Sequence, residues 1–348
     1  MLDTAIVDFL AVADADGENR LLQGTAAVLA RRQLRTHCYF DRHRAHGAHG
    51  LALHFRSPVG PDLLDEIVLQ AGDGAAAPWR FLPIIDNVRH TLADVFGGPD
   101  SVELFRAFSF DCAPLLWQWQ AQGLGAPDKR LVVALEVLVG YMYRMRARLE
   151  GKDAPAYPAL FVSFRSHFEG FAASLEDPAG AEHAFARRYM AVQPALKALV
   201  TAHESAAPPP PPAWLAPWQL QLERYFDDIH RRVLDGALVT GMTDLRRGGK
   251  NLLASKFHEQ IVSSKEYTTH AMKQPLFQTN RILLGLVYLS LFRLGLPLVE
   301  RYFLCYALSR FIEETHGVSA ERAFERSVAR SARRRRWSWL GMGRREGA

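Results

Sequence analysis

The first seventy residues combine strand-like and helix-like patterns of apolar positions. In GLALHFR, residues 50–56, the apolar residues Leu51, Leu53 and Phe55 fall at alternate positions, as in a strand with one buried face. VDFLAV and THCYFDRH are two further strand-like runs, and DADGEN between them has the composition of a turn. PDLLDEIVLQA, residues 61–71, starts with proline and acidic residues and then keeps a helical period. Mixed α and β structure is therefore expected here.

Helical periodicity dominates the chain after residue 100. A helix should begin at Asp100 or Ser101, either of which can cap it, and residues 129–150 keep one strongly apolar face. Further helices are predicted over residues 158–176, 180–203, 218–235, 251–262, 281–294 and 297–316. We therefore expect an α+β fold, with a mixed β-sheet in a strand-rich N-terminal part, flanking helices and a helical C-terminal part.

The chain is predicted to form one domain followed by a charged tail. AAPPPPPAWLAP, residues 206–217, has polyproline composition. Because the helices predicted on either side are amphipathic, we interpret it as a surface loop within a single α+β domain over residues 1–329. Residues 330–348 hold seven arginines and one glutamate, a balance of +6, whereas the whole chain carries +5. This basic tail is either a solvated terminus or a docking arm for an acidic peptide, nucleic acid or a membrane surface.

Composition also bears on compartment and partners. The longest apolar stretch, residues 282–298, contains Arg293, two glycines and Pro297, which favours a buried core helix over a membrane span. Three widely separated cysteines indicate a reducing compartment, and the first residues lack the basic region of a signal peptide, so a cytoplasmic protein is expected. The sequence contains no recognisable nucleic-acid-binding module, so no specific nucleic acid is expected as a partner.

Motifs of common enzyme classes are missing from the sequence. GxSxG, HExxH and Cys-x-x-Cys do not occur, and RRGGKNLL departs from the phosphate-loop pattern at two positions. Early histidines are numerous, but no cysteine or paired carboxylate completes a metal site with them: His37, His43, His46, His49 and His54. We expect neither a metal nor a cofactor.

The densest polar segment is residues 263–281, just before the apolar helix predicted at 281–294. It supplies hydroxyl, imidazole, amide and cationic groups next to a core element, as a peptide-handling cleft requires. Its members are Ser263, Ser264, Lys265, Tyr267, Thr268, Thr269, His270, Lys273, Gln274, Gln278, Asn280 and Arg281. The alternative is an ordinary surface loop in which Asn280 caps the following helix.

Three segments in order resemble one protein family. FGGPDSVELFRAFSFDC, residues 96–112, resembles the RYGGP…ELAE.LF.ADS segment of the thiopeptide-type bacteriocin biosynthesis domain, which is also the C-terminal domain of lantibiotic dehydratases. FDRHRAHGAHGLALHF resembles the strand–turn–strand segment F.RY.D…HLRLRF of that family, and QTNRILLGL resembles HM..NRL.G. The resemblance covers residues 36–314.

The resemblance implies one of two activities. One branch of the family eliminates glutamate from glutamylated Ser or Thr; the other, the pyridine synthases, joins two dehydroalanines of a peptide by a formal [4+2] aza-cycloaddition and expels water and the leader peptide. The eliminating branch is expected to carry arginines where this chain has Ala52 and His54, and a histidine where it has Leu276. Losing the guanidinium groups removes bidentate carboxylate recognition, and losing the imidazole removes a general acid or base.

The resemblance therefore favours a cofactor-independent pyridine synthase acting on a precursor peptide. The cycloaddition needs positioning and proton transfer, and the polar segment offers residues for both. The expected catalytic residues are His270, Tyr267, Ser264 and Ser263, and the expected substrate-binding residues are Thr269, Lys273, Gln274, Gln278, Asn280 and Arg281.

Leaders in such pathways tend to be acidic, as the resemblance implies. The expected leader-peptide contacts are Arg35, His37, Arg42 and Arg44, with the basic tail as a further candidate and strand addition as the binding mode. Other enzymes of the same pathway would be partners. Two alternatives stay open: a glutamate-elimination partner of a split dehydratase, and a non-enzymatic scaffold that binds the leader.

Overall fold

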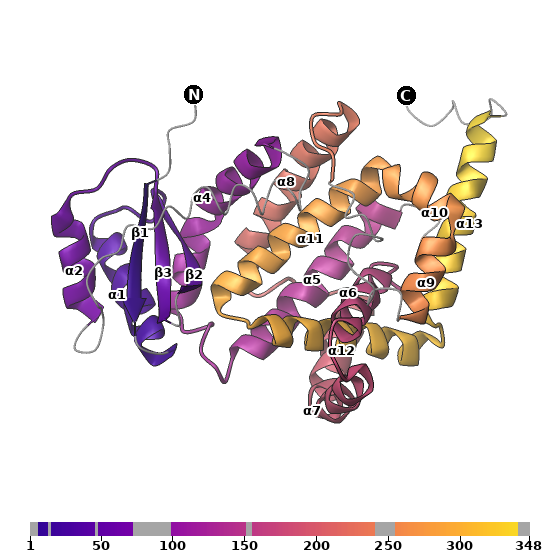
Figure 1. Cartoon of the computed structure of the whole chain (residues 1–348), viewed down its shortest axis with the longest axis horizontal. Helices are drawn as coiled ribbons and strands as arrows, with labels where there is room; N and C mark the ends of the chain where they lie inside the picture. Colours follow the sequence, from indigo (N-terminus) through magenta and orange to yellow (C-terminus); the bar gives the residue numbers. More distant parts are fainter. Residues whose placement is uncertain are drawn as a thin grey trace. The chain divides into compact units, whose positions relative to one another are not determined.

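The computed structural model describes residues 6–12, 15–45, 48–71, 99–150, 155–240 and 255–339 (Figure 1). Within these ranges the side chains of residues 6–12, 15–16, 43–45, 48–49, 147 and 334–339 are not described. The chain is mostly helical and divides into two compact units. Unit 1 consists of Met1–Ala134, Pro211–Gly241 and Ile282–Pro297; unit 2 consists of Leu135–Pro210, Met242–Arg281 and Leu298–Ala348.

Unit 1 contains a three-stranded antiparallel sheet. Its strands are β1 (Ile6–Val12), β2 (Cys38–Ala45) and β3 (Ala48–Phe55), in the order β1-β3-β2. The strand predicted here is confirmed as β3, but the prediction that only one face is buried was wrong, because Ala52 is buried as well as Leu51 and Leu53. His54, on the other face of the same strand, is also buried, which an antiparallel sheet with one wet face would not require.

The prediction of a strand-rich N-terminal part was wrong, although the α+β class holds. The segment taken as a turn leads into a helix of 17 residues, α1 (Ala15–Arg31), between β1 and β2. Leu21, Leu22, Val28 and Leu29 of α1 are buried at helical spacing. Helix α1 contacts β1 and β3, and α4 contacts β2, so helices flank the sheet.

The remaining helices of unit 1 match the periodicity closely. Helix α2 (Pro61–Ala71) has the predicted bounds, and α4 (Pro99–Ala121) continues through Pro114. Helix α8 (Ala216–Leu234) packs on α4. The first three residues of the FGGP turn lie outside the described residues.

Two helices contribute to both units. Helix α5 (Arg130–Glu150) begins in unit 1 and ends in unit 2, whereas α11 (Pro275–Leu294) begins in unit 2 and ends in unit 1. The apolar stretch at 282–298 is a buried core helix as predicted: Ile282, Leu283 and Leu286 are fully buried. Among the described residues, no helix has the length and apolar character needed to cross a membrane.

Unit 2 is helical throughout its described residues. Its helices, besides parts of α5 and α11, are α6 (Phe161–Ala173), α7 (Pro178–Glu204), α9 (Lys256–Ser263), α10 (Lys265–Thr269), the short 3₁₀ helix η3 (Ala271–Lys273), α12 (Leu298–His316) and α13 (Ala320–Trp339). Helix α12 forms the core and packs on α6 and α7. Tyr306 of α12 contacts the rings of Phe168 and Phe185, with ring centroids 4.8 and 6.0 Å away.

Two boundaries predicted from the sequence fall elsewhere in the structure. The proline-rich segment coincides with a passage between the units, at residues 210 and 211. The predicted start of the basic tail, residue 330, lies inside α13, whose backbone is helical to Trp339. The expectation of a single domain over residues 1–329 stays a prediction.

Candidate active site

The polar segment 263–281 is mostly helical, and no long surface loop forms there. It contains the end of α9, then α10 and η3, and the first two turns of α11. Ser263 Oγ donates to the carbonyl of Glu259 at 2.8 Å, and Ser264 caps α10 by accepting from the backbone N–H of Tyr267 at 3.3 Å. Both predicted catalytic serines therefore stabilise helix ends.

Tyr267 lies between two aromatic rings of unit 2. Its ring is edge-on to Phe277 and Phe324, with centroids 5.7 and 5.0 Å away. Burial raises the pKa of Tyr267 to about 12, and nearby Arg281 opposes that rise. The phenol is therefore protonated at neutral pH, so it can donate a proton or a hydrogen bond.

Arg281 connects Tyr267 to a histidine that sequence reasoning missed. Burial lowers the pKa of Arg281, and Tyr267 opposes this. On α6, burial is the main cause that lowers the pKa of His167 to about 3, and the positive charges of Arg301, Arg281 and His258 contribute to the same shift. A neutral imidazole beside two arginines is thus built into unit 2.

His258, on α9, is a second histidine held neutral. Its Nε2 lies 3.1 Å from Ser166 Oγ on α6, and its Nδ1 is buried with no hydrogen-bond partner among the described residues. Burial lowers the pKa of His258, and the charge of Glu169 opposes this. The imidazole of His258 is therefore neutral at neutral pH and can accept a proton, and the hydroxyl of Ser166 contacts the same ring.

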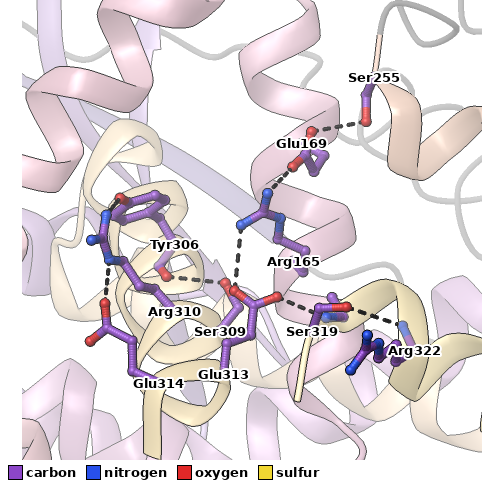
Figure 2. Close-up of polar contacts among 11 residues, drawn as sticks. Arg165, Glu169, Ser255, Tyr306, Ser309, Arg310, Glu313, Glu314, Ser319 and Arg322 are labelled. Carbon is purple, nitrogen blue, oxygen red and sulfur yellow. Dashed lines mark hydrogen bonds and ion pairs between the residues drawn. The ribbon is translucent and has the colours of Figure 1, made fainter. Parts of the chain in front are cut away.

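A network of charged residues fixes the position of His258. Glu169 Oε1 lies 2.6 Å from Arg165, and its Oε2 accepts from Ser255 Oγ at 2.9 Å. Ser255 in turn caps α9 by accepting from the backbone N–H of His258 at 3.3 Å. Figure 2 shows Arg165 between Glu169 and Glu313, with Ser255 beyond Glu169.

The other predicted substrate-binding residues differ in exposure and in the contacts that they make. Thr269 and Lys273 are exposed, and Gln278 is half-buried. Gln274 Nε2 donates to Ser331 Oγ on α13 at 2.7 Å. Asn280 does not cap α11, because that helix begins five residues earlier; its buried Oδ1 accepts from Tyr141 at 2.7 Å.

His270 ends α10. Its backbone N–H donates to the carbonyl of Glu266 at 3.0 Å, and its side chain is half-buried. The predicted acid or base thus directly follows the short helix that carries Tyr267, seven positions after Ser263 at the end of α9.

The residues predicted to bind a leader lie in unit 1. Arg42 is engaged inside the fold: it pairs with Glu18, and its Nε donates to the carbonyl of Arg293 at 3.0 Å. His37 is exposed and Arg35 half-buried, whereas the side chain of Arg44 lies outside the described residues. Strand β2 is an edge strand, but the carbonyl of Cys38 at its start already accepts from Trp117 at 2.7 Å.

The strand positions where the eliminating branch is expected to carry arginines are closed. His54 Nε2 lies 3.1 Å from Asp41 Oδ2, and its ring stacks on Tyr39 with centroids 4.3 Å apart. Arg293 donates to the other oxygen of Asp41 at 2.8 Å. Although burial acts in the opposite direction, Arg293 and His54 hold the pKa of Asp41 well below its usual range. His54 therefore contacts a permanent carboxylate.

A pocket of about 380 Å³ lies elsewhere in unit 1, between α4 and α8. Three carboxylates and two arginines line it, and Asp111 in its wall accepts from Tyr225 at 2.9 Å. None of the predicted site residues lines this pocket, so the pocket is not part of the candidate active site. Among the described residues, no three His, Cys, Asp or Glu side chains are arranged to hold a metal ion.

The fold resembles that of two solved structures over nearly the whole chain. The chain matches the crystal structure of TsrL with a TM-score of 0.69 and 21% identity, covering 93% of this chain and 99% of that one. It matches TbtD, a pyridine synthase from thiomuracin biosynthesis, with a TM-score of 0.58 and 15% identity, covering 91% of this chain and 100% of that one. No family profile and no curated protein sequence matches the chain. The family resemblance seen in the sequence is thus shown at the level of the fold.

Proposed function

We propose that this protein is a pyridine synthase that converts a dehydrated precursor peptide into a macrocycle. The observation that carries the proposal is the match of nearly the whole chain to a pyridine synthase fold. Three segments that resemble the same family, in the same order, support it. Thiopeptide biosynthesis is the corresponding pathway class, and a precursor peptide with a leader is the corresponding substrate.

The reaction balances without an oxidant or reductant. The amide before one dehydroalanine becomes an iminol, which forms a 2-azadiene with the alkene of that residue. The two ends of the azadiene form two C–C bonds with the alkene of the other dehydroalanine. The hydroxyl then leaves with a proton as water, and the leader leaves as a carboxamide, which gives a pyridine. The protein must hold the two alkenes together, move the amide proton and protonate the hydroxyl.

Unit 2 supplies groups for these tasks. In our proposal Tyr267 protonates the leaving hydroxyl, because burial keeps its phenol protonated. His258, in contact with Ser166, takes up the amide proton, and His270 is a second candidate on α10. Arg281 and Arg301, which act on His167, would stabilise negative charge on the reacting amide oxygen. Ser263 and Ser264 are left out, because they cap helices.

Glutamate elimination fits the described residues less well. At the strand position where that branch is expected to carry an arginine, His54 contacts Asp41. A substrate carboxylate there would meet a carboxylate that already holds its charge, which repels it. A scaffold without activity would not need neutral histidines beside half-buried arginines.

The test is mass spectrometry of a dehydrated precursor peptide incubated with the protein and no cofactor. We expect free leader carboxamide and a lighter core that absorbs in the ultraviolet. The Tyr267→Phe variant keeps both ring contacts, so we expect normal folding but turnover reduced about 10²–10⁴-fold. Tyr157→Phe is the matched control, because Tyr157 is another tyrosine of unit 2 that packs on a phenylalanine, and it is buried.

Two results would contradict the proposal. A peptide of unchanged mass that is bound but not converted would point to a scaffold. Loss of glutamate from a synthetic glutamylated peptide, with no conversion of the dehydrated one, would point to elimination. Equal activity of the Tyr267→Phe and Tyr157→Phe variants would remove Tyr267 from the mechanism.

A further inference from the structure

Helix α13 carries an unusual stripe of positive charge on its solvent side. It contains seven arginines and two glutamates in its 20 residues. Arg322, Arg326 and Arg333 are exposed, and their spacing of four and seven residues places them within about 40° of one another around the helix. They extend over about 16 Å along the axis. We call these three residues the α13 ridge.

The ridge lies opposite the buried face of the same helix. Ala323, Phe324 and Ser331 are buried against unit 2. Phe324 contacts the ring of Tyr267, and Ser331 accepts from Gln274. One face of α13 therefore supports the candidate site while the other faces solvent.

The charges of the ridge have no carboxylate partner in the part of the chain that the structure describes. Two half-buried arginines elsewhere in unit 2 do have one: Arg188 lies 2.7 Å from Glu300, and Arg310 lies 2.8 Å from Glu314. Glu325, a carboxylate of α13 close to the ridge, accepts from Gln260 at 2.9 Å. The guanidinium groups of the ridge thus face solvent, and no carboxylate of the described residues pairs with them.

Helix stability does not account for the ridge. Cations are favourable near a helix C-terminus, which explains arginines late in α13. Arg322 is in its first turn, where the positive end of the helix dipole disfavours a cation. Arg322 and Arg326 also repel each other at a spacing of four residues. A binding partner of negative charge would offset both costs.

We infer that the α13 ridge docks an acidic peptide segment. Arg322 and Arg326 are about 6 Å apart along the axis, close to the distance between alternate residues of an extended peptide. Carboxylates at alternate positions would therefore meet both guanidinium groups, each with paired N–H donors. The binding of an acidic peptide does not depend on the proposed function. Only the identification of that peptide as part of the precursor rests on it.

The test measures binding of the full chain to a short fluorescein-labelled peptide with glutamate at alternate positions, by fluorescence anisotropy. We expect saturable binding that weakens with added salt, and at least a tenfold loss of affinity in Arg322→Glu/Arg326→Glu. Arg187→Glu/Lys197→Glu is the control, because both residues are exposed on α7 in the same unit and the change in charge is equal. The control should bind as the unchanged protein does.

The reversal variant should fold, since an anion in the first turn suits the helix dipole. Arg322→Gln/Arg326→Gln, which only removes charge, should lose affinity in the same direction. Equal affinity of ridge and control variants would overturn the inference. Tighter binding of a single-stranded oligonucleotide, or of vesicles containing anionic lipid, through the same two arginines would overturn the choice of partner. The assay contains no dehydroalanine, so its failure and a failure of the cycloaddition assay are separate results.

Discussion

His167 is a histidine that the fold keeps uncharged. Burial, two arginines and a second histidine all disfavour its imidazolium form and lower its pKa to about 3. In the unfolded chain the same side chain has its ordinary pKa of about 6.5. Below pH 6.5 the side chain therefore binds a proton in the unfolded state but not in the folded state. The contribution of His167 to the free energy of unfolding is complete above pH 6.5 and is lost as the pH falls.

This predicts a pH-dependent difference between the protein and its His167→Gln variant. Between pH 6.5 and pH 4 the unchanged protein should lose up to about 1.4 kcal/mol of unfolding free energy per pH unit through this residue. The variant lacks that loss, so its stability relative to the unchanged protein should improve as the pH falls. Urea unfolding at a series of pH values measures it.

His183→Gln is the control, because His183 is exposed on α7. Its stability should follow the unchanged protein at every pH. A difference between His167→Gln and the unchanged protein that stays constant from pH 7.5 to pH 4 would mean that His167 is not held neutral.

The site that we propose includes two residues of the polar segment, Tyr267 and Arg281, each of which affects the pKa of the other. Ser263 and Ser264 looked the same in the sequence, but their hydroxyls are used by helix ends. His167 and His258 were missed because each stands alone in an amphipathic helix, and only the packing of α6 on α9 brings them together.

At the scale of elements, the start of α9 decides where His258 lies. Ser255 caps this helix and also donates to Glu169, so one hydroxyl connects the helix end to the ion pair on α6. The carboxylate is held by Arg165. Ser255 is thus a positioning residue for His258 rather than a group that would touch substrate.

Replacing Ser255 by Ala should reveal this role. The lost cap should cost about 1 kcal/mol of unfolding free energy. Turnover of the dehydrated peptide should fall through kcat more than through KM, because His258 shifts while the peptide contacts remain. Ser255→Thr keeps a hydroxyl and should restore both stability and turnover.

The control is Ser205→Ala, since Ser205 Oγ bonds only its own helix end on α7, at the carbonyl of Ala202. It should leave turnover unchanged. A Ser255→Ala protein that loses stability yet keeps its full kcat would show that Ser255 supports the helix alone.

At the scale of the whole molecule, each unit is assembled from separate stretches of chain. Unit 1 needs residues before and after the proline-rich segment: Trp119 Nε1 donates to the carbonyl of Trp214, and Trp218 Nε1 donates to Ser290. In unit 2, α6 packs on α12. A break at the proline-rich segment would therefore cut the chain without removing a whole unit.

We predict that a protein cleaved there stays together. A protease site inserted between Ala207 and Pro208, where the backbone is neither helix nor strand, should be accessible. After cleavage the two fragments should elute as one species in size-exclusion chromatography and separate in urea. Insertion of the same site within α12 is the control and should disrupt folding, because that helix is buried. Separation of the fragments without denaturant would contradict the assembly described here.

Periodicity predicted most of the long helices of both units, because long amphipathic segments carry a strong signal, but it did not predict the short helix α10 within the polar segment. It missed α1, whose start has turn-like composition, and it gave no division into units. That division depends on contacts between residues more than a hundred positions apart, such as Asp41 with Arg293, and no local pattern encodes them.

The interleaving of the two units also bears on how such a gene can change. Neither unit is encoded by one contiguous stretch, and α5 and α11 each belong to both. A single crossover therefore cannot exchange one whole unit and leave the other unchanged. Substrate preference in this fold should therefore diverge through point substitutions and through lengthening of surface loops, not through exchange of modules between genes.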